Sequence, residues 1–259
     1  MNILIIGAGT IGKGFIKYLI DKNTITVIDN NEWAIAELKH EYNNRIFTNI
    51  DDYISITDNH IIFPIDVIIH TAAYKHVELG EENSIAFVEN NITKLIELVK
   101  WWNYRRVLLK EDIRFLFIST DKAVEPISLY GFTKAIGELI VKAYGGYIVR
   151  LGNILSSSGS VIPVWEKAIE EKKPLPITNW DMKRYVIDVE NAISQIWELF
   201  LKGEKLIIPK CEKITVKKLF EKVLSKHNLS TYPVKIIGER AGEKMEEKLR
   251  WDYEKRIII

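Results

Sequence analysis

The sequence predicts an α/β protein whose larger part is a doubly wound parallel sheet and whose smaller part is an irregular C-terminal lobe. Three observations lead to this prediction: short apolar runs rich in β-branched residues, longer amphipathic stretches between them, and a change of pattern after residue 150. Near-continuous apolar strands that alternate with helices are typical of a parallel sheet covered on both faces. We expect the first domain to span residues 1–151 and the lobe, interleaved with it, to span 152–259.

The individual elements follow from the same periodicity. Strands are expected at residues 3–6, 24–28, 67–70, 115–119 and 147–150. Helices are expected at residues 11–21, 32–42, 82–102 and 133–144. Serines, glycines and three prolines in residues 152–184 predict loops around one helix near 163–172. Residues 215–249 predict two helices that flank a short strand at 234–237.

The composition narrows the class of protein. With 259 residues, 47% of them hydrophobic and 27% charged, the chain has the make-up of a soluble globular protein. Because 36 basic and 35 acidic residues nearly cancel, we expect neither a nucleic acid nor a membrane as partner. The single cysteine, Cys211, fits a reducing compartment, and the apolar run "ILIIGAG" is too short to span a membrane. The run also lacks the features of a signal peptide, so a cytoplasmic protein is expected. His70 and His76 lack metal-ligand spacing, so no metal is expected.

The first strand–helix junction, "NILIIGAGTIGKGF", places Gly7, Gly9 and Gly12 in G-x-G-x-x-G spacing. In a dinucleotide-binding turn, the first glycine permits the tight bend, the second lets the backbone approach a pyrophosphate, and the third lets the helix pack closely. The N-terminus of the helix attracts the phosphates. This pattern predicts a Rossmann-type NAD(P)-binding domain, and the alternative is a glycine-rich turn without a ligand.

The second strand supports a dinucleotide ligand. It ends in Asp29, which lies 17 residues after Gly12, near the position where an acid meets the adenosine ribose. Asn30 and Asn31 follow it, without an arginine that could hold a 2′-phosphate. NAD is therefore favoured over NADP.

Residues 117–138, "FISTDKAVEPISLYGFTKAIGE", place Tyr130 four residues before Lys134 at the start of a predicted helix. Both side chains should lie on one face of that helix. A nearby ammonium lowers the pKa of a tyrosine from near 10 toward neutrality, so the phenolate could take a proton from a sugar hydroxyl. Thr120, at the end of the preceding strand, could hydrogen-bond that hydroxyl. The alternative is a tyrosine and a lysine on a solvated helix face.

An acid–base pair, Asp121 and Lys122, follows the same strand. Oxidation of an alcohol needs only Thr120, Tyr130 and Lys134, so the pair suggests a second step, the elimination of water. Lys122, if partly neutral, could remove a proton next to the new carbonyl, while protonated Asp121 could donate to the departing hydroxyl. The alternative is that Asp121 caps a turn and Lys122 is solvated.

The stretches "HTAAYKHVELGEENSIAFVENNI" and "STDKAVEPISLYGFTKAIGE" resemble segments of the extended short-chain dehydrogenase/reductase superfamily. More narrowly, they resemble the inverting UDP-N-acetylglucosamine 4,6-dehydratases of the polysaccharide biosynthesis branch, in which a strand ending S-T-D-K precedes L-Y-G-x-T-K. Sugar dehydratases that act on dTDP-glucose carry glutamate where this sequence has Lys122. The resemblance implies oxidation at C4 of a UDP-N-acetylhexosamine, loss of water across C5–C6, and return of hydride to C6.

The same resemblance extends the list of expected site residues. The catalytic set is Thr120, Asp121, Lys122, Tyr130 and Lys134. The cofactor-binding set is Gly7, Gly9, Thr10, Ile11, Gly12, Asp29, Asn30, Asp51, Ala72, Ala73, Tyr74, Asn91, Tyr130 and Lys134. The segments "VRLGNILSSSGSVIPVWEKAIEEKKPLPITNWDMKRY" and "IGERAGEKMEEKL" imply a nucleotide-sugar-binding lobe. Its expected substrate-binding residues are Lys75, Asn153, Val161, Pro163, Arg184, Arg240 and Glu243.

Departures from the family pattern and rival functions remain. Ile6, Ser158 and Ala241 stand where the family usually has glycine, arginine and proline. A nucleotide-sugar epimerase or reductase on the same scaffold would leave Asp121 and Lys122 without chemistry. A redox sensor that binds dinucleotide without turnover is the non-enzymatic alternative. Superfamily members often pair through the helices predicted at 82–102 and around Tyr130, so a homo-oligomer is expected.

Overall fold

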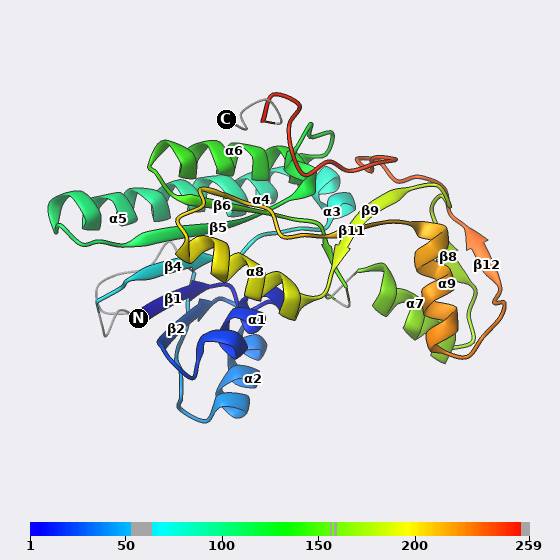
Figure 1. Ribbon diagram of the computed structural model, residues 1–259, viewed down its shortest axis with the longest axis horizontal. Coiled ribbons are helices and arrows are strands. Elements are labelled where there is room, and N and C mark those ends of the chain that lie inside the picture. Colours follow the sequence, from blue (N-terminus) through cyan, green and yellow to red (C-terminus); the bar gives the residue numbers. More distant parts are fainter. Residues whose placement is uncertain (53–63, 156, 158–159, 255–259) are drawn as a thin grey trace.

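A seven-stranded parallel sheet forms the centre of the larger part of the molecule (Figure 1). The computed structural model describes residues 1–52, 64–155, 157 and 160–254. The strands are β1 (Asn2–Ile6), β2 (Thr24–Asp29), β3 (Phe47–Ile50), β4 (Val67–His70), β5 (Arg114–Thr120), β6 (Tyr147–Leu151) and β10 (Leu206–Ile207). Their order, β10-β6-β5-β4-β1-β2-β3, reverses direction at β1 and β4, which confirms the doubly wound parallel sheet.

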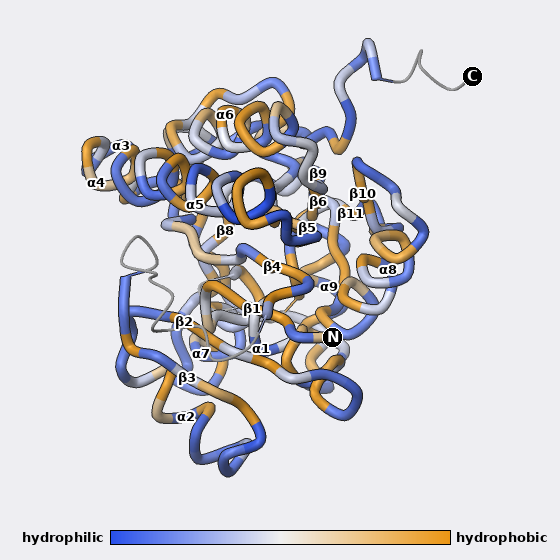
Figure 2. Tube along the Cα trace, turned by 90° about the vertical axis from the view of Figure 1, so that its left-hand side faces the viewer, coloured by the Kyte–Doolittle hydropathy of each residue, from blue (hydrophilic) through white to orange (hydrophobic). Residues whose placement is uncertain are grey.

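Helices cover both faces of this sheet. On one face lie α1 (Thr10–Leu19), α2 (Glu32–Tyr42) and α8 (Val189–Leu201), and on the other lie α5 (Lys94–Leu108) and α6 (Leu129–Ala143). Because successive strand residues point to opposite faces, Ile3 and Ile5 of β1 pack against the first group, whereas Leu4 and Ile6 pack against the second. Figure 2 shows these apolar strands in the interior of the molecule.

The predicted helix at 82–102 is divided in the structure. It consists of α3 (Val77–Glu82), α4 (Ser84–Val88), a π-helical turn (Glu89–Thr93) and α5, which continues to Leu108. The π-helical turn breaks the periodicity and buries Asn90 and Asn91. The predicted helix at 133–144 begins earlier, at Leu129, because the Ser128 side chain caps it by accepting a hydrogen bond from Gly131 N at 3.1 Å.

The lobe is built from short elements around a core of its own. It contains β7 (Asn153–Ile154), α7 (Val161–Glu170), β8 (Leu175–Ile177), β9 (Lys183–Ile187), β11 (Glu212–Thr215), α9 (Val216–Lys226) and β12 (Val234–Ile236). Trp165, Leu175 and Ile177 are fully buried at its centre. Two small sheets, β11-β9-β7 and β12-β8, hold the lobe together.

The sequence analysis did not predict α8 or β10. Both come from the second half of the chain, yet they return to the larger part, where β10 pairs with β6 and α8 packs on α1. The close approach of the two helices depends on Gly14, since a Cβ there would lie 2.8 Å from Val189.

The prediction of a second helix in the tail is wrong. After β12, residues 237–254, named here the C-terminal segment, form no α-helix. Gly238 and Gly242 adopt φ values of 79° and 78°, which a helix does not tolerate. The segment instead runs beside β9, where Lys183 N donates to Met245 O at 2.8 Å.

Candidate active site

A cleft of about 630 Å³ opens between the carboxyl edge of the large sheet and the lobe. Gly7, Thr71 and Thr120, at or directly after the ends of β1, β4 and β5, form one wall, and residues of α7 and β9 form the opposite wall. In open α/β sheets this edge, at the point where the strand order reverses, is where ligands bind.

The glycine loop after β1 has the geometry of a phosphate-binding turn. Gly7 adopts φ +104°, and a Cβ on Gly12 would lie 1.9 Å from the carbonyl oxygen of Gly7. By contrast, a Cβ on Gly9 would meet no atom within 4 Å, and Gly9 lines the cleft directly before α1. Open space at the N-terminus of a helix is suited to an anionic ligand.

Asp29 lies at the end of β2, beside the glycine loop. Its carboxylate accepts hydrogen bonds from Ala8 N at 2.6 Å and from Asn31 N at 2.7 Å. Asn30 and Asp51 line the cleft next to it. A carboxylate oxygen can accept more than one hydrogen bond, so Asp29 retains the capacity to accept from a ribose hydroxyl.

The loop after β4 forms the floor of the cleft, and Asn91 holds it in place. Asn91 accepts from Tyr74 N at 2.8 Å and donates to Tyr74 O at 2.9 Å and to Thr133 Oγ1 at 3.1 Å. Asn91 is buried and does not line the cleft, whereas Ala72, Ala73 and Tyr74 do. Asn91 therefore fixes the loop rather than facing the cleft. Lys75 lines the cleft as well, and burial lowers the pKa of its ammonium.

Thr120, Tyr130 and Lys134 line the same part of the cleft. The expected low pKa of Tyr130 is wrong for this structure. Burial, followed by smaller opposing effects of Lys122 and Asp121, raises the pKa of Tyr130 to about 12. Burial also lowers the pKa of Lys134 to about 7, and its Nζ lies 4.2 Å from the ring centroid of Phe117. The ammonium that acts on the phenol is that of Lys122.

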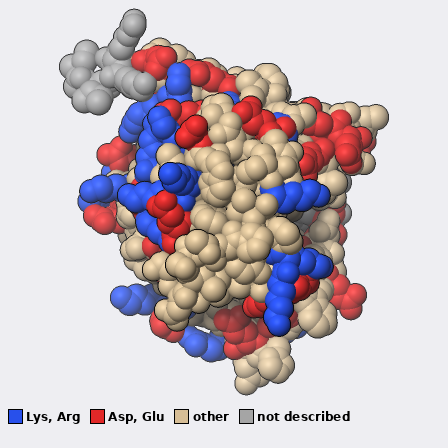
Figure 3. Space-filling view, turned by 90° about the vertical axis from the view of Figure 1, so that its right-hand side faces the viewer, with Lys and Arg blue, Asp and Glu red and all other residues tan. Residues whose placement is uncertain are grey.

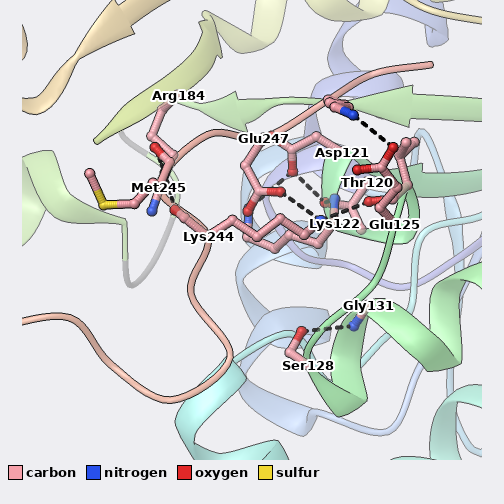
Figure 4. A network of polar contacts seen from close by, with 12 residues as sticks. Thr120, Asp121, Lys122, Glu125, Ser128, Gly131, Arg184, Lys244, Met245 and Glu247 are labelled. Atoms are coloured by element: carbon pink, nitrogen blue, oxygen red, sulfur yellow. Dashed lines mark hydrogen bonds and ion pairs between the residues drawn. The ribbon is translucent and has the colours of Figure 1, made fainter. Parts of the chain in front are cut away.

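Asp121 and Lys122 form a short turn after β5 (Figure 4). Asp121 is 0% exposed; its Oδ1 accepts from Thr120 Oγ1 at 3.0 Å and from Lys122 Nζ at 3.0 Å. Its Oδ2 is buried and has no hydrogen-bond partner among the described residues. Lys122 Nζ also donates to Asn153 Oδ1 at 3.3 Å, which joins the turn to the lobe.

The charges of this pair differ from the expectation in one respect. Burial raises the pKa of the Asp121 carboxyl, in line with an acid that keeps its proton. Burial by itself lowers the pKa of Lys122, but the charges of Asp121 and Glu247 outweigh it, so the net pKa is raised. Lys122 is therefore an ammonium in this structure, and the expectation of a partly neutral amine is wrong.

Glu247 is a site residue that the sequence analysis missed. It comes from the C-terminal segment, lies 3.6 Å from Lys122 Nζ through Oε1, and its side chain is 2% exposed. It also lines the cleft. The signal was a second acidic position four residues after Glu243 in "ERAGEKMEEKL", but nothing local distinguishes Glu247 from the neighbouring Glu246.

The two arginines expected to bind the diphosphate contact other residues of the protein in this structure. Arg184 Nη1 donates to Lys244 O at 2.9 Å, and Arg240 Nε lies 3.1 Å from Glu78 Oε1. Both arginines nevertheless line the cleft, as does Glu243, whose Oε2 is buried without a hydrogen-bond partner in the described part of the chain.

The structure thus brings most of the expected residues to one cleft. Those that line it are Gly7, Gly9, Thr10, Ile11, Asp29, Asn30, Asp51, Ala72, Ala73, Tyr74, Lys75, Thr120, Lys122, Tyr130, Lys134, Asn153, Val161, Arg184, Arg240 and Glu243. Those that do not are Gly12, Asn91, Asp121 and Pro163. Gly12 and Asn91 support the residues that line the cleft. Asp121 accepts a hydrogen bond from Lys122, which does line it. Ser158 lies outside the described residues.

Within the described ranges, no three His, Cys, Asp or Glu side chains gather as a metal would require. The same ranges hold no helix with both the length and the apolar character needed to cross a membrane. Figure 3 shows that basic and acidic side chains occur next to one another on the face at the lobe end.

A doubly wound sheet whose cleft joins a G-x-G-x-x-G loop to a threonine, a tyrosine and a lysine defines an enzyme of the extended short-chain dehydrogenase/reductase superfamily. Comparison with protein families narrows the class. Residues 3–257 match the family described as "Polysaccharide biosynthesis protein", and the chain belongs to that family.

Individual relatives agree with this placement. An uncharacterized membrane protein of Methanocaldococcus jannaschii is 32% identical over 265 residues, which cover 94% of this chain and 78% of the relative. A UDP-N-acetylglucosamine 4,6-dehydratase (inverting) of Campylobacter jejuni is 31% identical over 267 residues, covering 95% and 76%. The X-ray structure of Pen from Bacillus thuringiensis superposes with a TM-score of 0.84 at 29% identity, covering 96% and 83%. The chain is an enzyme of the nucleotide-sugar dehydratase and epimerase kind.

Proposed function

We propose that the protein is a 4,6-dehydratase of UDP-N-acetylglucosamine that serves surface polysaccharide or glycan biosynthesis. One observation carries this proposal: the Asp121–Lys122 pair, joined at 3.0 Å, lies beside Tyr130 at the cleft. Oxidation of an alcohol has no use for this pair, whereas elimination of water needs both an acid and a base. The similarity to the Campylobacter jejuni dehydratase supports the same substrate.

The residues present fit a nicotinamide dinucleotide, NAD or NADP. The open space at Gly9 can receive the pyrophosphate, and Asp29 can accept from the adenosine ribose, which favours NAD. The nicotinamide, when bound, supplies the acceptor and donor of hydride. Tyr130 and Lys134 would hold the ribose of the nicotinamide, at the end of the cleft opposite the glycine loop.

Tyr130 would act as the base for the oxidation at C4, while Thr120 orients the C4 hydroxyl. The high pKa of Tyr130 in the free protein means that the phenol holds its proton until positive charge is placed beside it. Lys122 already acts in this direction. Lys134, close to neutral in the free protein, would act in the same direction once it is protonated.

Asp121 and Lys122 would carry out the elimination. Asp121, biased toward its protonated form, would give its proton to the departing C6 hydroxyl. Lys122 would remove the proton from C5, which the neighbouring carbonyl makes acidic. Because Asp121 Oδ1 lies 3.0 Å from Lys122 Nζ, both groups would act on the same side of the sugar.

The lobe would hold the rest of the nucleotide sugar. Asn153, fixed by Lys122, would face the sugar, and Arg184 and Arg240 would bind the diphosphate. For Arg240 this means exchanging its exposed contact with Glu78 for the phosphates. The remaining contacts are proposed for Lys75, Val161, Pro163 and Glu243.

A homo-oligomer is proposed as well. Ile85 of α4 and Phe132, Ile136 and Leu139 of α6 are exposed apolar side chains on one side of the molecule. Exposed apolar patches of this kind mark protein contacts.

The test is the substitution Lys122→Met, with Lys248→Met as control. Lys248 is an exposed lysine that pairs with Glu125 outside the cleft. Wild type and control should convert UDP-N-acetylglucosamine to a product lighter by one water, measured by mass spectrometry. Lys122→Met should bind dinucleotide normally and yield no such product. Unchanged turnover by Lys122→Met would overturn the assignment.

One observation favours a second candidate, a nucleotide-sugar epimerase or reductase. Lys122 is an ammonium in this structure and could serve only to bind and to lower the pKa of Tyr130. In that case the product would retain the elements of water. A dinucleotide-binding redox sensor would show no turnover at all.

A further inference from the structure

Lys122 Nζ has oxygen atoms of three residues around it, two as hydrogen-bond acceptors and one as an ion-pair partner. Asp121 Oδ1 lies at 3.0 Å, Asn153 Oδ1 at 3.3 Å and Glu247 Oε1 at 3.6 Å. To act as the base at C5, Lys122 must first lose a proton. A separate acid must keep its own proton for the leaving hydroxyl. An Asp121 that already holds the proton for the leaving hydroxyl cannot also accept the proton of Lys122. Asn153 cannot take a proton, which leaves Glu247.

We propose that Glu247 is a positioning residue of the proton-transfer site, which takes the proton that Lys122 must lose and returns it after water has left. This inference rests on the proposed dehydration, and it adds a residue from the C-terminal segment to the pair on the turn after β5.

The position of Glu247 is held from the side opposite Lys122. Its Oε2 lies 3.1 Å from Lys244 Nζ, which also donates to Val124 O at 2.7 Å (Figure 4). Each carboxylate oxygen therefore has a lysine of its own. Buried carboxylates with two fixed cations are geometrically constrained, so Oε1 stays directed at Lys122.

A buried ion pair anchors the C-terminal segment on the far side of Glu247. Arg150 of β6 forms short hydrogen bonds with Glu138 Oε2 and Glu254 Oε2, both at 2.6 Å, and Arg150 Nη1 donates to Leu249 O at 3.4 Å. The segment is thus tied down on both sides of Glu247.

Electrostatic effects set which carboxyl of the cluster is ionised before the elimination. Burial would raise the pKa of Glu247, but the charges of Lys122, Lys244 and Arg184 outweigh it and lower the pKa. For Asp121, burial raises the pKa, and the Glu247 charge raises it further. Among the described residues, the titratable and charged groups that act on the cluster are Asp121, Lys122, Tyr130, Arg184, Cys211, Lys244 and Glu247. Of the two carboxyls Asp121 is therefore the more readily protonated, and the elimination begins with Asp121 protonated and Glu247 ionised.

The proton balance closes from this state. A proton moves from Lys122 Nζ to Glu247 Oε1, leaving a neutral amine and a neutral carboxyl. The amine then takes the C5 proton, the electron pair of the C5–H bond forms the C5–C6 double bond, and the C6–O bond breaks as Asp121 gives its proton to the departing hydroxyl. Water leaves. The proton on Glu247 returns through Lys122 to Asp121, which restores the starting state.

The test compares Glu247→Gln with Glu246→Gln. Glu246 is the adjacent residue, but it is half-exposed and pairs with Lys183 and Lys213 outside the cleft. The rate of deuterium incorporation at C5 in D₂O is measured against pH. Wild type and Glu246→Gln should give a flat profile above the pKa of Glu247. Glu247→Gln should be slower by at least about tenfold at pH 7, with a rate that rises with pH because solvent must remove the proton.

Three outcomes separate this inference from the proposed function. Absence of a dehydrated product from wild type would overturn the proposed function. Product from wild type together with a flat profile and full rate in Glu247→Gln would overturn the role of Glu247 alone. If Glu247→Gln does not fold, Glu247→Asp decides the matter, since it keeps the acid at greater distance. It should retain the flat profile at reduced rate, and a profile that rises with pH would contradict the proposal.

Discussion

Substitution by alanine should have opposite effects at two of the three glycines of the G-x-G-x-x-G turn, Gly12 and Gly9. In Gly12→Ala the new Cβ would lie 1.9 Å from Gly7 O, about 1.5 Å short of the 3.4 Å at which ordinary contact begins. Alanine gains about 1 kcal/mol over glycine in a helix, but overpacking costs about 1–3 kcal/mol. Because the obstacle is a backbone carbonyl that cannot rotate away, we place the overpacking cost at the upper end, and the net loss is about 2 kcal/mol.

Gly9→Ala should leave the stability unchanged. Its Cβ meets no atom within 4 Å, and its backbone, at φ −75°, is accessible to alanine. The methyl group would instead occupy the space where we place the pyrophosphate.

Thermal melts with and without NAD separate the two variants. Gly12→Ala should lose about 4–8 °C in Tm without ligand, since 1 kcal/mol corresponds to about 2–4 °C in a chain of this size. Gly9→Ala should melt like wild type without ligand and lose the stabilisation by NAD. A Gly12→Ala protein as stable as wild type would refute the reasoning from close packing. A Gly9→Ala protein that binds NAD normally would refute the assignment of the phosphate site.

Three further predictions follow from buried polar groups. Arg150→Met leaves Glu138 buried without its ion-pair partner, with the Ser119 hydroxyl as its remaining hydrogen-bond donor, and should cost about 3–5 kcal/mol in urea unfolding, whereas a loss below about 1 kcal/mol would contradict the buried ion pair. Asn91→Ala removes the hydrogen bonds that fix the loop after β4; it should weaken dinucleotide binding and lower Tm, and unchanged affinity would show that the loop holds itself. Burial and, secondarily, Lys134 lower the pKa of His70 to about 3, so the unfolded chain binds a proton between about pH 6.5 and 3 that the native state refuses. Native stability is therefore lost as pH falls through this window, and His70→Phe should lose less over it, as measured by urea unfolding at each pH.

The parts of the fold that were predicted correctly are those encoded locally. The strand Val67–His70 and the helix Glu32–Tyr42 agree to the residue, because apolar runs and amphipathic periodicity are properties of neighbouring residues. The π-helical turn at Glu89–Thr93 was not predicted, because the residues on both sides of it are helical and the whole stretch was assigned to one helix. The helix Val189–Leu201 was missed although its apolar residues have helical spacing; it packs on α1 beside the large sheet.

The candidate site shows the same division. Its residue types and spacing could be predicted from the fingerprint and from the turn after β5, where the partners are close in sequence. The charge of Lys122 could not, because it depends on burial and, besides the adjacent Asp121, on Glu247, which reaches the cleft only through the tertiary structure. The prediction of a low pKa for Tyr130 was wrong for a similar reason. The spacing places Lys134 on the same helix face, but the effect of burial on the pKa of Tyr130 outweighs that of the cations.

The measurement that tests the central claim most directly is proton NMR of the purified protein incubated with UDP-N-acetylglucosamine in D₂O. The account predicts a new methyl signal from C6, with deuterium at C5, from wild type and not from Lys122→Met. A spectrum in which the sugar keeps its C6 hydroxyl, after addition of both NAD and NADP, would contradict the dehydration and leave Asp121 and Lys122 without the role assigned to them.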